Sequence, residues 1–260
     1  MKSFSAICVV IFLTLLPDLL FTQQKVMSDG EELYYEVFYA YINIGWVKFY
    51  TERVTGKSNY YITYAKLKSN EAIPFVNVDY DFRSEFEISD NAPKPYKFIS
   101  YEYSDGKKSM LEYTFRYDSG YVSVIKKGFD GKTEIDKKLY SSVVYQDGLS
   151  IFYFARLGSF SNSSRYVPVL MHSDSSGMRI NFTTARKKIS ISEWDDAVSS
   201  VYIDGFAYFT AVFGLTGEFE GWFSNDEARV PLKARLKVNI GNISLELKSW
   251  KRNNWNPPSY

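Results

Sequence analysis

The sequence of 260 residues contains 31 lysines and arginines and 30 aspartates and glutamates, so its formal net charge is only +1. A nucleic-acid-binding protein normally carries a concentrated basic surface, and the short run at 186–188 does not provide one, so we expect no nucleic-acid partner. Hydrophobic residues make up 45% of the chain, which is enough for a large core and excludes a disordered protein.

The first 24 residues have the features of a signal peptide. Lys2 precedes a mostly apolar run over 4–16, which has the length of a signal-peptide core rather than of a membrane span. Pro17 and Asp18 interrupt the apolar character, and we predict cleavage near 22–24. The mature chain would then be exported, to the periplasm or the outer envelope, and would carry no transmembrane span. An uncleaved N-terminal anchor is the alternative.

Alternating apolar and polar residues predict a series of β-strands over the first half of the mature chain. The longest covers 76–88, where the apolar residues share one parity and the charged residues the other. A strand of about 13 residues is long enough to bend around a curved sheet. Shorter strands are expected at 33–41, 47–49, 60–64, 96–103, 108–117 and 121–127.

One short helix is expected near residues 148–157. Asp147 is a suitable N-cap, and apolar residues recur at helical spacing from Leu149 to Leu157. Arg156 stands in the last turn, where a cation is favourable, and Gly158 follows.

Beyond the helix, a loop rich in serine and asparagine over 160–165 is followed by further strands. We expect these strands at 166–171, 178–184 and 188–192. The apolar stretch 198–213 contains Asp204-Gly205, a turn signal that we interpret as a break between two strands.

The end of the chain carries the clearest pattern. Apolar and polar residues alternate over 232–240 and again over 243–247, on either side of a Gly241-Asn242 turn. This arrangement predicts an antiparallel hairpin with one buried apolar face and one solvent-exposed polar face. The last residues, 253–260, are expected to form a tail.

These elements predict a mainly β protein. We expect a strongly curved antiparallel sheet, an open or partial barrel, that forms one domain over 25–252 and holds the single helix. A β-sandwich is the alternative, and the strand order within 159–217 does not follow from the patterns. The sequence also leaves the oligomeric state open.

Three blocks of the sequence resemble a known family. They are Gly30–Val37 with Ile42–Gly45, Asp147–Arg156, and Trp222–Pro231 with Gly241–Leu247. The resemblance is to the bacterial exported proteins catalogued as domain of unknown function 3108, and it spans nearly all of the mature chain. It implies an envelope protein of antiparallel β architecture, and it brings no catalytic residues.

The residue types argue against catalysis, a metal site or a cofactor. His172 is the only histidine and stands in a turn-like stretch, where an exposed or capping role is expected. Zinc sites need several His or Cys ligands, and Cys8, the one cysteine, lies inside the predicted signal peptide. The remaining option is a carbohydrate-active hydrolase that uses a carboxylate pair, such as Asp79 with Asp81 or Glu218 with Glu220.

We therefore favour a non-catalytic binding protein. Tyrosine and phenylalanine, 22 and 20 residues, exceed what a small core needs, and barrel interiors of this size commonly hold ligands. The expected ligand is a lipid or another hydrophobic molecule on the concave face of the sheet. The candidate ligand-binding residues are Tyr80, Phe82, Phe86 and Trp222. The plain alternative is that the aromatic side chains only fill the core.

Overall fold

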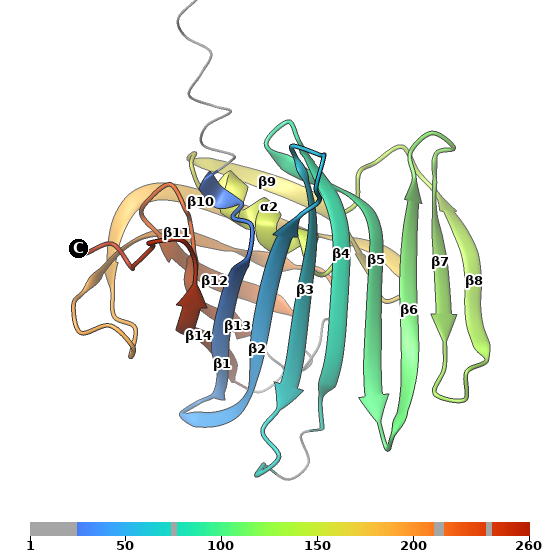
Figure 1. The fold of residues 1–260 in the computed structure, drawn as a ribbon, viewed down its shortest axis with the longest axis horizontal. Coiled ribbons are helices and arrows are strands. Elements are labelled where there is room, and N and C mark those ends of the chain that lie inside the picture. The colour runs from blue at the N-terminus through green and yellow to red at the C-terminus, as the bar shows by residue number, and fades with distance from the viewer. Residues whose placement is uncertain (1–24, 74–76, 211–215, 238–240) are drawn as a thin grey trace, which may run out of the picture.

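The computed structural model describes residues 25–73, 77–210, 216–237 and 241–260, so the predicted signal peptide lies outside the described residues. All fourteen strands belong to one antiparallel sheet that curls around its own interior without closing (Figure 1). This confirms the predicted open, strongly curved sheet rather than a sandwich. Within the described residues, no helix has the length and apolar character needed to cross a bilayer.

The strands fall into two groups on either side of one helix. The first group is β1 (Glu31–Tyr39), β2 (Ile42–Arg53), β3 (Tyr60–Ser69), β4 (Asp79–Ser89), β5 (Ala92–Ser104), β6 (Lys107–Arg116), β7 (Tyr121–Lys127) and β8 (Thr133–Tyr140). After α2 (Ser150–Gly158) come β9 (Ser163–Met171), β10 (Asp174–Ile189), β11 (Val198–Ala207), β12 (Gly217–Ser224), β13 (Pro231–Lys237) and β14 (Asn242–Lys251).

The first and last strands pair with each other at the centre of the sheet. From this β1–β14 pair, one meander runs outward to β8 and the other runs outward to β9. The two outer strands are not joined by a hydrogen-bonded ladder. The sheet therefore has a seam between β8 and β9.

The antiparallel order gives the sheet two distinct edges. Every connection from an odd strand to the next even strand lies on one edge, which we call the open edge. The opposite edge, which we call the capped edge, holds α2, the segment that precedes β1 and the segment that follows β14. In Figure 1 the turns of the open edge point downward from β1–β8, and α2 lies near the top.

The expected alternation of side chains builds the core. In β1, Leu33, Tyr35 and Val37 are each at most 3% exposed, and the residues between them are partly exposed. The same two-residue period recurs in β3 and in the second half of β4. One continuous apolar face therefore lines the inside of the curve.

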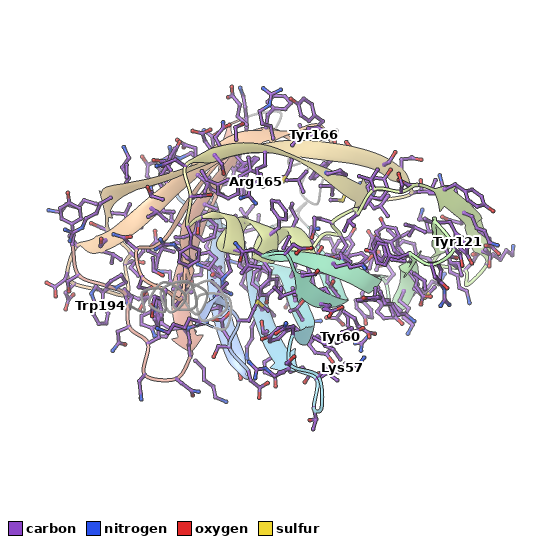
Figure 2. All side chains as sticks on the ribbon, turned by 90° about the horizontal axis from the view of Figure 1, so that it is seen from above. Lys57, Tyr60, Tyr121, Arg165, Tyr166 and Trp194 are labelled. Atoms are coloured by element: carbon purple, nitrogen blue, oxygen red, sulfur yellow. The ribbon has the colours of Figure 1, made fainter. Side chains whose placement is uncertain are left out.

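Helix α2 lies inside the curved sheet, as the view from above shows (Figure 2). Tyr153 and Leu157 pack against one wall, with Phe86 of β4. Ala155 packs against the opposite wall, with Phe182 of β10. The helix is buried on several sides, which explains why its apolar residues are not confined to one narrow stripe.

Strand boundaries differ from expectation mainly after the helix. β9 begins at Ser163, inside the predicted loop, and the two strands predicted over 178–192 form one long strand, β10, which runs to Ile189 with a register shift between Thr183 and Lys187. β4 begins at Asp79, and Val76 lies outside the described residues. The C-terminal segment 253–260 lies along the start of β11, where Ser259 pairs with Val198.

The predicted break at Asp204-Gly205 is wrong, because β11 runs through both residues to Ala207. Gly205 pairs with Ile180 on one side and Phe219 on the other. A Cβ atom at this position would lie 2.0 Å from the carbonyl oxygen of Arg179 and 2.5 Å from the ring of Phe219. The glycine therefore permits a close approach within the sheet instead of a turn.

Candidate functional site

An apolar cavity of about 580 Å³ lies inside the curved sheet, between α2 and the open edge. Both groups of strands contribute to its wall, so it spans the two halves of the sheet. Its volume is within the range of sites for small molecules, about 300–1,000 Å³. The apolar lining residues are Val37, Val47, Phe49, Ala65, Leu67, Val78, Tyr80, Phe82, Phe98, Met110, Leu111, Tyr113, Leu149, Leu170, Met171, Leu236, Ile243 and Leu245.

Polar lining residues gather toward the open edge. Asn77, Glu102, Ser109 and Lys126 each lie at or within three residues of a connection on that edge. Lys126 forms an ion pair of 2.6 Å with Glu134. The cavity is therefore apolar inside and polar at its mouth.

Tyr80 connects the apolar wall to this mouth. It faces Glu102 directly across the β4–β5 ladder, and both residues line the cavity. Burial, together with the neighbouring Glu102 carboxylate, raises the pKa of the Tyr80 hydroxyl. Tyr80 therefore stays neutral and can donate a hydrogen bond at the boundary of the apolar region.

The β9–β10 turn closes one side of the cavity. The Tyr113 hydroxyl, from β6, donates to the His172 carbonyl oxygen at 2.5 Å. Lys137 of β8 pairs with Asp174 at 3.0 Å, which bridges the seam between the two outer strands. His172 itself is exposed, adopts a φ of 56° in the turn, and lies 3.0 Å from the Thr210 carbonyl oxygen through Nε2.

The turn that leads into α2 forms the inner end of the cavity. Asp147 is fully buried, and its Oδ1 accepts the backbone N–H groups of Leu149 and Ser150 at 2.8 and 2.9 Å. Its Oδ2 accepts the Ser84 hydroxyl at 2.7 Å. Asp147 thus organises the start of the helix, as the sequence indicated, although the first helical residue is Ser150. Burial outweighs these hydrogen bonds and raises the pKa of Asp147.

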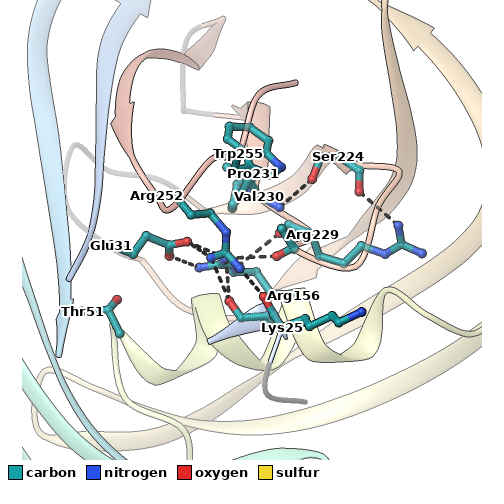
Figure 3. Close-up of polar contacts among 12 residues, drawn as sticks. Lys25, Glu31, Thr51, Arg156, Ser224, Arg229, Val230, Pro231, Arg252 and Trp255 are labelled. Atoms are coloured by element: carbon teal, nitrogen blue, oxygen red, sulfur yellow. Dashed lines mark hydrogen bonds and ion pairs between the residues drawn. The ribbon is translucent and has the colours of Figure 1, made fainter. Parts of the chain in front are cut away.

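A buried arginine holds α2 to the capped edge (Figure 3). Arg156 is 0% exposed, and its guanidinium makes a two-pronged ion pair with Glu31, at 2.6 and 3.1 Å. It also donates to the carbonyl oxygens of Val26, Ala228 and Arg229. One helical side chain therefore joins the segment before β1, the start of β1 and the β12–β13 turn.

A second arginine completes this cluster. Arg252, just after β14, donates to Glu31 Oε2, which also accepts from Arg156, and to the carbonyl oxygens of Lys25 and Val26. Burial lowers the pKa of Arg252, and the proximity of Glu31 opposes that effect. For Arg156, burial acts in the same direction but the contact with Glu31 overcomes it and raises the pKa. Two guanidinium groups thus share one carboxylate, and all three side chains are at most 8% exposed.

The sequence pattern already indicated a buried charge at this position, but the strand and helix predictions did not use it. Glu31 shares the inward parity of Leu33 and Tyr35, so a charged residue stands where the strand is otherwise apolar. Arg156 was expected only as a cation near the helix end. Its burial identifies it instead as the counter-ion of Glu31.

The four predicted ligand-binding residues separate into three environments. Tyr80 and Phe82 line the cavity, with their rings stacked 5.5 Å apart. Phe86 faces the same interior but is fully buried against Tyr153 of α2, outside the cavity.

Trp222 lies on the opposite face of the sheet. Its neighbours Gly221 and Phe223 are buried, and its own ring packs against Tyr202 at 5.4 Å and lies under Arg235 at 5.8 Å. Trp222 is therefore placed outside the cavity, and we do not retain it as a residue of this site.

The candidate carboxylate pairs are already bound to cations. Lys66 bridges Asp79 and Asp81, at 3.2 and 2.9 Å. Glu218 pairs with Lys237 at 3.1 Å and Glu220 pairs with Arg235 at 2.8 Å. Among the described residues, no three His, Cys, Asp or Glu side chains gather as a metal site would require.

Comparisons with known proteins agree with this architecture. The family described as "Protein of unknown function (DUF3108)" matches residues 34–248, which confirms the resemblance seen in the sequence. A search of curated proteins gave no significant match. Among solved structures, the fold is similar to a β-barrel-like protein of domain of unknown function DUF1849 from Brucella abortus. The TM-score is 0.56 at 9% identity, over 88% of this chain and 100% of that chain, so this similarity concerns the fold alone.

The buried ion cluster predicts a large difference between two adjacent glutamates. Glu31→Gln leaves two buried guanidinium groups without a counter-ion, and we expect it to lower the free energy of unfolding by about 3–5 kcal/mol. Glu32→Gln is the matched control. Glu32 points outward and pairs with Lys48 and Lys251 at the surface, so its loss should cost less than about 1 kcal/mol. Urea unfolding of both variants measures the difference, and equal losses would contradict the role of Glu31.

The raised pKa of Asp147 predicts a pH-dependent effect of Asp147→Asn. A buried carboxyl with a raised native pKa stabilises the fold below the unfolded pKa of about 4, and this contribution is lost as the pH rises through the native pKa. Asparagine keeps an acceptor for the helix start and carries no charge. We therefore expect the stability of the variant, relative to wild type, to increase between pH 4 and pH 7.

Urea unfolding at several pH values measures this difference. Asp136→Asn, on the exposed side of β8, serves as the control for loss of a solvated carboxylate. A difference between wild type and Asp147→Asn that stays constant with pH would show that the buried carboxyl does not titrate as argued.

Proposed function

This chain belongs to the DUF3108 family, and we propose that it is a non-catalytic exported protein of the cell envelope that binds the acyl chain of a lipid in the cavity. The observation that carries the proposal is the cavity itself, which is apolar inside and polar at its mouth. An acyl chain needs no hydrogen bonds from its site. Each methylene group moved from water into such a cavity contributes about 0.8 kcal/mol.

The shape of the cavity suits a molecule with one apolar and one polar end. Phe49, Phe82 and Leu149 line its apolar part, whereas Glu102 and Lys126 lie toward the open edge. An acyl chain would occupy the apolar part, and the polar head group would remain near the mouth. The carboxylate pairs are each bound to lysine or arginine, so no observation favours the hydrolase alternative.

The packing of the first described residues supports export. Val26 and Met27 are at most 2% exposed and pack with Tyr153 and Leu157 of α2. Cleavage near 22–24 would remove the predicted signal peptide and leave this packed segment intact. N-terminal sequencing of the protein from a periplasmic extract tests this part of the proposal, and an N-terminus at Met1 would contradict cleavage.

The binding proposal predicts that a side chain placed inside the cavity displaces the ligand. Ser100 lines the cavity between Phe82 and Leu111 on the neighbouring strands, so Ser100→Phe would fill part of the space. We expect the affinity for cis-parinaric acid, a fluorescent fatty acid, to fall at least about ten-fold, because several methylene contacts are lost. Fluorescence titration of delipidated protein measures the affinity.

The matched control introduces the same side chain on the outer face. Thr114 of β6 follows the inward-facing Tyr113 and is partly exposed, so Thr114→Phe should leave the affinity unchanged. Native mass spectrometry of the untreated protein provides a second readout, with a lipid adduct expected for wild type and reduced for Ser100→Phe. Unchanged binding by Ser100→Phe, or an equal loss in Thr114→Phe, would contradict the cavity as the site.

A further inference from the structure

Glu102 is the one carboxylate that lines the cavity in the described chain, and it lies at the mouth. It is half-buried near the end of β5. Across the two ladders it faces Tyr80 of β4 and Ser109 of β6, which also line the cavity. Both neighbours are neutral, because burial raises the pKa of the Tyr80 hydroxyl and keeps it protonated. The negative charge of Glu102 is therefore flanked by hydroxyl groups and not by a cation.

The other ionisable side chains of the cavity do not offset this charge. Lys126 lies on β7, two strands from β5, and its ammonium group is paired with Glu134 at 2.6 Å. His172 contacts a backbone carbonyl oxygen through Nε2. Among the described residues, no lysine or arginine forms an ion pair with Glu102. No charged residue occurs in the internal segments outside the described residues, which are 74–76, 211–215 and 238–240.

The charges around the mouth balance one another. The ion pairs near the open edge are Lys68–Glu71, Lys66 with Asp79 and Asp81, Lys126–Glu134, Lys132–Asp130, Lys137–Asp174 and Lys237–Glu218. The nearby side chains outside ion pairs in the described chain, none of which lines the cavity, are Lys107, Lys108, Lys127 and Asp105. Lys107, which shares the parity of Ser109, is exposed and lies opposite Ser104. The three lysines are offset by Asp105, Glu102 and the second carboxylate on Lys66, so the edge as a whole favours neither sign.

Selection by charge therefore falls to the side chain inside the mouth. We infer that the cavity prefers an amphiphile whose head group carries a protonated amine, which the Glu102 carboxylate holds while the chain lies against the apolar wall. The inference rests on the proposed function, since the mouth can select a head group only if the chain is bound. It names the class of lipid that the cavity takes.

The chemistry of the mouth distinguishes three kinds of head group. An ammonium group beside Glu102 gains charge-assisted hydrogen bonds, which are stronger than those between neutral groups. A hydroxyl head group can donate to the same carboxylate without the attraction between charges. A carboxylate head group is repelled by Glu102, although its chain is still bound by apolar contacts. Affinity at equal chain length should therefore fall from amine to alcohol to acid.

Displacement of cis-parinaric acid tests this order. The competitors are dodecylamine, dodecanol and lauric acid, which have the same chain length, each used at pH 7 below the concentration at which it forms micelles. We expect the inhibition constant of dodecylamine to be at least about five-fold lower than that of lauric acid, with dodecanol between them. Direct titration of the probe with each variant corrects for changes in the affinity of the probe itself.

Substitutions of Glu102 identify the origin of the preference. Glu102→Gln keeps the size of the side chain and an acceptor for Tyr80, so the constants for amine and acid should come within about two-fold of each other. Glu102→Lys should invert the order. The control is Asp105→Asn, in the β5–β6 turn outside the cavity, where asparagine tolerates the φ of 50°. It should keep the wild-type order, and all three variants should bind dodecanol as wild type does.

Two lysophospholipids with a lauroyl chain identify the source of the amine. Lysophosphatidylethanolamine and lysophosphatidylglycerol both carry a phosphate, and only the first carries an ammonium group. Stronger displacement by the first assigns the amine to a phospholipid. A preference seen only with dodecylamine assigns it to an amphiphile without phosphate. Either result supports selection for an amine.

The neutral competitor separates this inference from the proposed function. Displacement by dodecanol with equal constants for amine and acid would overturn the inference and leave the cavity as a site for the chain. Retention of the amine preference by Glu102→Gln, or an equal loss in Asp105→Asn, would also overturn it. Failure of dodecanol to displace the probe, together with unchanged probe binding by Ser100→Phe, would contradict the proposed function and the inference with it.

Discussion

The structure depends on how the capped edge of an unclosed sheet is filled. A barrel closed by hydrogen bonds holds its own shape, but here β8 and β9 do not pair, so the interior must be held by what lies inside it. Arg156 does this from α2, because its guanidinium binds Glu31 and three backbone carbonyl groups, one before β1 and two in the β12–β13 turn. Buried charges of this kind are stable only when each donor and acceptor finds a partner, which makes the position of the helix specific.

The position of α2 at the capped edge explains why the cavity lies toward the open edge. α2 is only nine residues long and occupies the capped side of the interior, where Tyr153 and Leu157 complete the core. Toward the open edge no helix lies inside the sheet in the described chain, and the inward-facing side chains of β2–β6 face a cavity instead. The two edges of the sheet therefore have different roles. One stabilises the fold, and the other leaves space that a ligand can occupy.

The fold could be predicted from the sequence because it depends on a local rule. A two-residue alternation is visible in β1, in β3 and in β4, and it fixes which of their side chains face inward once the sheet is known to curve. The helix was equally local, since Asp147 and the apolar spacing after it identify its start. Tyr80 and Phe82 line the cavity because their parity on β4 was assigned correctly.

What could not be predicted depends on contacts between distant residues. Glu31 and Arg156 are 125 positions apart, so nothing near either residue identifies its partner. Trp222 was named as a candidate ligand-binding residue without a parity argument, whereas the burial of Gly221 and Phe223 places it on the outer face of the sheet. Asp204-Gly205 was interpreted as a turn signal, because the close approach of Arg179 and Phe219 that requires a glycine exists only after the strands pair.

The uneven distribution of strong contacts also bears on dynamics. The capped edge is held by charge-assisted hydrogen bonds that are almost completely buried. The seam between β8 and β9 is bridged near the cavity by the exposed Lys137–Asp174 pair and by the bond from Tyr113 to the His172 carbonyl. An exposed ion pair contributes little to stability, so local opening costs less at the seam than at the helix. Gln146 ties β9 to the segment before α2 through backbone hydrogen bonds with Pro168 and Leu170, both 2.9 Å long. The weaker contacts of the seam therefore lie near the β9–β10 turn, beside the cavity.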